Sequence, residues 1–195
     1  MKRLKKSSVK TITTMVILGC LIVGAFVYIS NREEKEKMEQ VVTVSTATKL
    51  IEKDLQKEYP PTPREVIKFY SNILQCVYSD ELTEEQLTRL GEQVILLYDD
   101  ELLSVNPSDE IIDNLMAETA LYRATNQIIS SYTIDSGDNI VTWKQEDVEY
   151  ARLLAVYTIR EESNFTKTCE EFILRKNEEG QWKIVGWRLA DNNDL

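Results

Sequence analysis

The chain has 195 residues, with 33 Asp and Glu against 23 Lys and Arg, a formal charge of −10 and no histidine. This acidic balance argues against a nucleic-acid partner, because a phosphate backbone needs a basic surface, and against charge-driven docking on anionic lipid. The lack of histidine removes the usual general base near neutral pH, the Ser-His and Cys-His pairs, and nearly all zinc sites.

The first element is an uncharged and mostly apolar segment over residues 11–30, preceded by five cations and no acid. About 20 residues in a helix span roughly 30 Å, the thickness of a bilayer core. Because cationic flanks stay inside, residues 1–10 should form a cytoplasmic tail, and everything after residue 31 should lie outside the cell. We therefore expect a single-pass protein of the cell membrane with an extracellular C-terminal domain.

Two alternatives compete with this uncleaved transmembrane helix. A cleaved signal peptide needs a short apolar stretch and then a small-x-small site, but residues 26–29 are bulky. Ile17-Leu18-Gly19-Cys20 is similar to a lipobox, which would place a lipid on Cys20, although the apolar run continues well beyond it. We favour the uncleaved anchor and keep lipidation as the alternative.

Residues 31–45 predict a charged linker, and residues 46–191 predict one extracytoplasmic domain large enough for a single core. Without the five N-terminal cations, 18 Lys and Arg remain against 33 acids, a formal charge of −15. Solubility explains such a charge, and a basic partner or bound cations are the alternatives.

The first half of this domain predicts helices. Leu50, Ile51 and Leu55 indicate a short amphipathic helix that Pro60-Pro61 ends. Longer helices should start at two capping boxes, Thr62-Pro63-Arg64-Glu65 and Thr83-Glu84-Glu85-Gln86, and a further one at Asn106-Pro107.

The second half predicts antiparallel strands joined by turns at residues 135–138, 162–164 and 177–180. Helices followed by such a meander predict an α+β fold with helices packed on one face of a curved sheet. On the last strand, alternation sends Trp182 and Trp187 to opposite faces, and we expect Trp187 in the core and Trp182 nearer solvent. The predicted strands cover residues 128–134, 140–143, 149–159, 165–174 and 181–189.

One candidate ligand pocket involves the long strand. Tyr150 and Arg152 share a face of it, and we expect Trp143 on the neighbouring strand to lie in the core or in the wall of a pocket. If this face points inward, Arg152 is a buried cation that needs an acidic partner or an anionic ligand. The alternative is an outward arginine that pairs across the sheet.

No catalytic, metal-binding or cofactor-binding residue is predicted, and no cofactor is expected. The acidic cluster Tyr98-Asp99-Asp100-Glu101 is either a set of ligands for a hard cation such as calcium or a helix end followed by a solvated turn. Cys76 and Cys169 are either buried thiols or one disulfide.

The order of elements, with Phe172-Ile173-Leu174-Arg175-Lys176 and Gln181-Trp182-Lys183-Ile184 near the end, resembles the cystatin-like, nuclear transport factor 2-like cone. This resemblance implies a pocket between sheet and helices. The whole chain is also similar to a family of uncharacterised single-pass membrane proteins of Clostridia, which implies a Gram-positive source and no particular activity. That similarity rests on residues 59–66, 97–103, 129–132 and 157–160.

These observations lead us to expect a non-catalytic binding or interaction module outside the membrane, whose partners are the membrane and another envelope protein. A scaffold subunit of a type IV secretion-like assembly is one alternative, by analogy of layout alone. A small-molecule enzyme of the polyketide-cyclase type is the other.

Overall fold

The computed structural model describes residues 45–190, which belong to one compact unit. The expected cytoplasmic tail, transmembrane helix, lipidation site and most of the linker lie outside the described residues, as does residue 191. Within the described part, no helix is long and apolar enough to cross a bilayer. Five α-helices precede a five-stranded sheet there, which confirms the predicted α+β class.

The first three helices begin at hydroxyl caps. Ser45 caps α2 (Thr46–Ile51), and Thr62 caps α3 (Pro63–Ser79), where its Oγ1 accepts the N–H of Glu65 at 3.2 Å. Thr83 and Gln86 form a reciprocal capping box at the start of α4 (Glu84–Ile95). The sequence therefore located the starts of α3 and α4 correctly, because side-chain oxygens replace the partners that the first helical N–H groups lack.

The next two helices differ in how well the sequence predicts them. α6 (Ser108–Ala124) begins directly after Pro107, as expected. The short α5 (Asp100–Val105) was not predicted, and its first two residues belong to the acidic cluster for which a helix end and a turn were one alternative. α4 and α6 approach closely, because a Cβ atom at Gly91 would stand 3.1 Å from Cγ1 of Ile112.

The sheet has the order β1-β3-β4-β5, with all of these neighbours antiparallel. β2 pairs with the start of β3 and β1 with its end, so both occupy the same edge of β3. A 3₁₀ turn, η1 (Gly137–Asn139), lies between them. The strands are β1 (Gln127–Ile134), β2 (Val141–Gln145), β3 (Val148–Glu161), β4 (Asn164–Lys176) and β5 (Trp182–Leu189).

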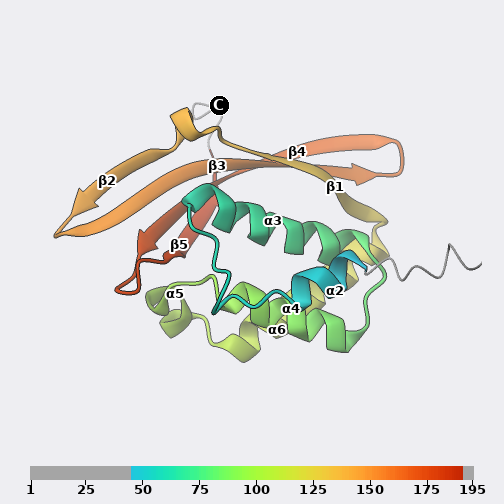
Figure 1. The fold of residues 1–195 in the computed structure, drawn as a ribbon. Helices are drawn as coiled ribbons and strands as arrows, with labels where there is room; N and C mark the ends of the chain where they lie inside the picture. The colour runs from blue at the N-terminus through green and yellow to red at the C-terminus, as the bar shows by residue number, and fades with distance from the viewer. Residues whose placement is uncertain (1–44, 191–195) are drawn as a thin grey trace, which may run out of the picture. The chain divides into compact units, whose positions relative to one another are not determined.

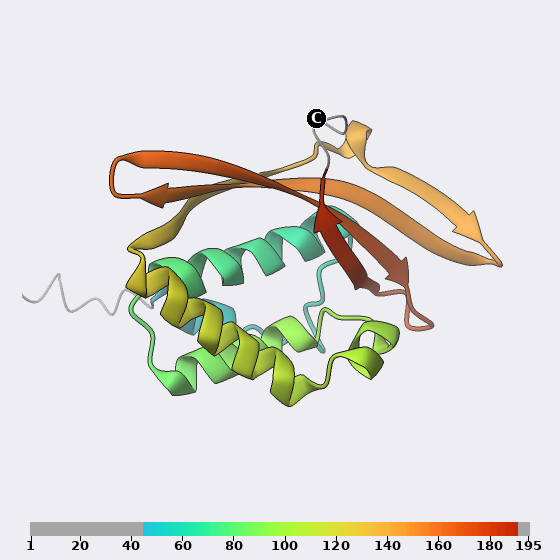
Figure 2. The same ribbon diagram turned by 180° about the vertical axis from the view of Figure 1, so that it is seen from behind.

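The described helices all lie on one side of the sheet, below the long β3 and β4 in Figure 1 and again in the reverse view of Figure 2. We call the side toward the helices the inner face and the opposite side the outer face. Alternation along β3 and β4 buries one set of side chains against the helices. The buried inner-face set is Ala151, Leu153, Ala155, Tyr157, Phe172 and Leu174.

The prediction for the two tryptophans of β5 was wrong. Trp182 is 7% exposed and Trp187 is 42% exposed. The pairing of β4 with β5 shifts between Ile173 and Leu174, which inserts one extra residue into β5 near Gly186. This β-bulge reverses the alternation beyond it, so both tryptophans lie on the inner face. Trp182 belongs to the core, and Trp187 lies where the core meets solvent.

Candidate functional site

A cavity lies between α3, α6 and the bulged end of β5, and we call it the inner pocket. Its volume is about 480 Å³, within the range of small-molecule sites. Four aromatic rings form much of its wall, together with aliphatic side chains, two amides and one carboxylate. The residues that the following argument uses are Tyr70, Leu74, Tyr78, Tyr98, Glu118 and Trp187.

Helical periodicity brings these side chains together. Tyr70, Leu74 and Tyr78 follow one another at intervals of four in α3, so they share the face that lines the cavity. Leu115 and Glu118 are three apart in α6 and face the same cavity. Such a spacing predicts core packing equally well, so by itself it does not indicate a pocket.

Three rings of the inner pocket form a cluster. The ring centroid of Trp187 lies 5.7 Å from that of Tyr98 and 6.1 Å from that of Tyr70. The Tyr70 and Tyr98 centroids are 6.3 Å apart. On the other side of the cavity, Tyr78 stacks on Tyr122 of α6 at 4.4 Å. Because only Trp187 of the four lining rings is substantially exposed, it forms the mouth of the pocket.

Two carboxylates accompany the rings. The hydroxyl of Tyr78 donates a hydrogen bond of 2.5 Å to Oε2 of Glu118. Glu170 lies on the inner face, two residues before Phe172 in β4. Burial, and then the charge of Glu118, raises the pKa of Glu170 from its usual 4.5 to about 7. Glu170 can therefore exchange a proton near neutral pH.

The tyrosines of the pocket stay neutral over the physiological range. Burial is the first cause that raises the pKa of Tyr78, and its hydrogen bond to Glu118 is the second. Burial also raises the pKa of Tyr70 and of Tyr98, and the two hydroxyls interact with each other. The pocket thus presents phenol groups that donate hydrogen bonds and do not act as bases.

The predicted pocket residues Tyr150, Arg152 and Trp143 lie elsewhere, on the outer face of the sheet. Trp143 of β2 stacks on Tyr150 of β3 with centroids 5.4 Å apart. Arg152 reaches across to β4, where its Nη1 is 3.3 Å from Oε2 of Glu171. Arg152 therefore has the outward orientation and an acidic partner across the sheet.

These three residues do not line a common cavity. Arg152 and Glu171 border an outer groove of about 780 Å³, beside the break between β1 and β2. Trp143 and Tyr150 line a separate shallow depression of about 220 Å³. In the outer groove Glu171 is already held by two arginines, because Nη2 of Arg188 lies 3.0 Å from its Oε1.

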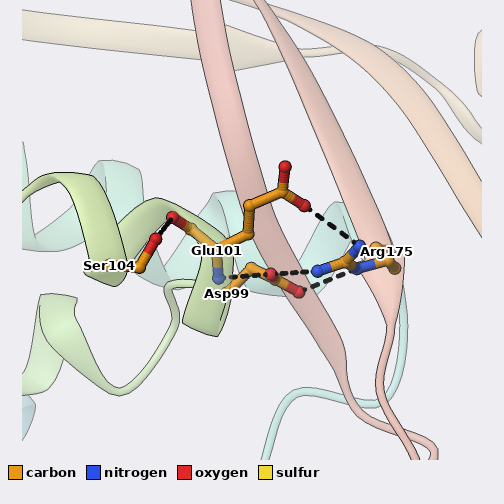
Figure 3. A network of polar contacts seen from close by, with 4 residues as sticks. All are labelled: Asp99, Glu101, Ser104 and Arg175. Atoms are coloured by element: carbon orange, nitrogen blue, oxygen red, sulfur yellow. Dashed lines mark hydrogen bonds and ion pairs between the residues drawn. The ribbon is translucent and has the colours of Figure 1, made fainter.

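The acidic cluster at residues 98–101 supports structure, and Asp100 and Glu101 are exposed in the first turn of α5. Asp99 is buried, caps α5 through the N–H of Glu101, and forms a two-point salt bridge with Arg175 of β4. Glu101 adds a contact of 3.2 Å to the same guanidinium, as Figure 3 shows. The hydrogen bond that Arg175 donates to Asp99 is the first cause that raises the pKa of Arg175. Across the described residues, no group of acids, cysteines or histidines is arranged to hold a metal ion.

The two cysteines of the domain are not bonded to each other. Cys76 is buried in α3, where its thiol donates to Asp80, and burial raises its pKa to about 12. Cys169 is half-buried on β4. Of the two alternatives from the sequence, thiols rather than a disulfide are present.

Comparison with curated proteins finds no match to this chain. A family match covers residues 1–187, which is nearly the full length. It spans every helix of the described part and most of β5, including all residues of the inner pocket. The chain belongs to the family described as a domain of unknown function (DUF6715).

Proposed function

We propose that the protein is a membrane-anchored binding module whose domain outside the membrane receives a ligand in the inner pocket. The observation that carries this proposal is the pocket itself, a cavity of about 480 Å³ between helices and sheet with an aromatic wall and an exposed tryptophan at its mouth. Concave, mainly apolar cavities with a few convergent polar groups are the usual form of small-molecule sites. A cone of the nuclear transport factor 2-like type is the fold to which we assign this domain.

The anchor rests on the sequence. Residues 11–30 are uncharged and long enough for one span, and the cations before them favour a cytoplasmic N-terminus. Protease added to intact protoplasts should remove the domain and spare the tail. A protected domain would contradict this orientation, and a lipid on Cys20 would replace the helical anchor by a lipoprotein.

The binding function is tested with a variant that fills the pocket. Leu74 lines the cavity, whereas Leu121 on α6 is exposed, so Leu74→Trp should block the site and Leu121→Trp should not. The full chain in maltoside detergent is screened by thermal shift against cationic, neutral and anionic small molecules. We expect compounds that raise the Tm of the wild type and of Leu121→Trp but not of Leu74→Trp. A screen in which no compound distinguishes the variants would contradict the proposal.

One observation favours a second candidate, acid–base catalysis on a small molecule. Glu170 has a pKa of about 7 and lies near tyrosine hydroxyls on the same face. A carboxylate of that pKa is matched to proton abstraction at neutral pH. Turnover of a bound compound by the wild type, lost in Glu170→Gln while binding persists, would support an enzyme over a binding module.

A further inference from the structure

We propose that the ligand of the inner pocket is a small organic cation of the alkylammonium type, held against the rings of Tyr70, Tyr98 and Trp187. This inference rests on the proposed binding function and names the ligand's chemical class. It follows from three features of the pocket: its ring faces, its uncompensated negative charge and its lack of metal-ligand geometry.

The ring cluster is the first feature. Aromatic faces carry negative potential, and a cation near such a face is attracted most strongly by tryptophan. The three centroids lie within 5.7–6.3 Å of one another, so the rings form one continuous aromatic surface. Trp187 is 42% exposed at the mouth, which leaves part of its ring available to a ligand.

The charge of the pocket is the second feature. Glu118 lines the cavity, and Glu170 is close enough for the charge of Glu118 to affect its protonation. No lysine or arginine is among the described residues that line the pocket, and in the same part of the chain neither carboxylate has a salt bridge. Glu118 is exposed and accepts only the hydrogen bond of Tyr78, and Glu170 is half-buried, so a cationic ligand would supply the positive charge that the described lining does not.

The chemistry of the lining separates an organic cation from a metal ion. Calcium takes six to eight oxygen ligands, and magnesium requires an octahedral set. The inner pocket offers one lining carboxylate among rings, aliphatic groups and amides, and the described residues hold no cluster suited to a metal. A quaternary ammonium group has no N–H donor, is weakly hydrated and fits against aromatic rings without such a ligand set.

The ligand series of the test isolates charge. Choline is compared with its neutral carbon isostere, in which a tert-butyl group replaces the trimethylammonium group. The anionic member of the series is 3,3-dimethylbutanoate, which carries the same tert-butyl group on a carboxylate. Binding to the full chain in maltoside detergent is measured by isothermal titration calorimetry at constant ionic strength. We expect choline to bind at least about tenfold more tightly than the isostere, and the anion to bind most weakly.

The variants isolate the pocket. Trp187→Leu removes an exposed ring of the pocket, and Trp143→Leu removes an equally exposed ring from the outer face, 38% against 42%. Glu118→Gln removes the lining charge, and Glu110→Gln changes an exposed glutamate on the same helix. We expect each pocket variant to weaken choline binding about tenfold and each control to leave it unchanged.

The outcomes separate the ligand class from the function. Equal binding of choline and its isostere would overturn the cation and retain a binding pocket. Failure of choline to bind, when the thermal-shift screen yields neutral or anionic ligands blocked by Leu74→Trp, would do the same. If that screen yields no ligand at all, the proposed function fails together with the inference.

Discussion

Glu170 and Glu171 are adjacent in β4, yet they point to opposite faces of the sheet and are stabilised in opposite ways. On the outer face, the carboxylate of Glu171 is buried between the guanidinium groups of Arg152 and Arg188. On the inner face, burial and then the charge of Glu118 raise the pKa of Glu170 to about 7. One step along a strand therefore separates a neutralised acid from an uncompensated one.

This contrast distinguishes the functions of the two faces. Where the chain itself provides both partners of an ion pair, the arrangement explains the packing of the sheet and leaves nothing for a ligand to satisfy. Where the chain places a carboxylate beside rings without a cationic partner, a ligand can supply the missing positive charge. The inner face is therefore the better candidate for function, although both faces carry cavities.

The largest expected effect compares the tryptophans of the two faces. Trp182→Ala should lower the free energy of unfolding by about 3–5 kcal/mol, because a buried aromatic is replaced by a cavity. Trp143→Ala, on the outer face, should cost about 1 kcal/mol or less. Urea denaturation measures both. Similar losses would mean that the two faces do not differ in packing as the exposures indicate.

A paired carboxylate at the sheet margin should give the next largest effect. Asp99→Ala removes the cap of α5 and leaves Arg175 without its two-point partner, so a loss of about 2–4 kcal/mol is expected. The neighbouring exposed residue supplies the control, since Asp100→Ala should change stability by about 0.5 kcal/mol or less. Equal effects would show that Asp99 contributes only its general negative charge.

The carboxylate of Glu170 should make the free energy of unfolding depend on pH. The folded pKa of Glu170 lies above the unfolded value of 4.5, so its stabilising contribution is complete below about pH 4.5 and is lost as the pH rises through about 7. The wild type should lose about 2–3 kcal/mol from this group between about pH 5 and about pH 9. In Glu170→Gln, the free energy of unfolding, measured by denaturation at several pH values across this range, should not show that loss. Parallel curves for the two proteins would contradict it.

The smallest loss of stability is expected at Glu171, the neighbour of Glu170 whose charge is paired with two arginines. Glu171→Gln should cost about 1–2 kcal/mol, since its arginine partners are about half-exposed and can be solvated instead. Arg152→Gln and Arg188→Gln should each cost less, because the other arginine remains. A loss at Glu171 larger than that at Asp99 would reverse the order of the two ion-pair networks.

Local signals in the sequence predicted much of the fold. Thr62 and Thr83 mark helix starts because a hydroxyl three residues before a free N–H is sufficient to cap it. The turn ending at Gly180, which has a φ of +77°, could be located for a similar reason, since glycine tolerates that conformation. Alternation along β3 places Ala151, Leu153, Ala155 and Tyr157 on one face, and the structure shows that this face is the buried one.

The candidate site depended on contacts that no local signal encodes. The bulge near Gly186 adds one residue to β5, and it alone brings Trp187 to the inner face. The pairing of Asp99 with Arg175 joins residues 76 positions apart. Arg152 attracted attention as a charge on an apolar strand, but its partner Glu171 could be identified only once the register of β3 and β4 was known.

The segment before α5 also affects how the sheet can meet other chains. The N–H of Ile184 donates to the carbonyl of Leu97, and the N–H of Asp99 donates to the carbonyl of Ile184, so this segment runs alongside β5 as a short parallel bridge. An edge strand with open N–H and C=O groups recruits strands from neighbouring molecules, and coverage or a bulge prevents this. β5 has both protections, at Ile184 and near Gly186, which discourages edge-to-edge polymerisation from this margin.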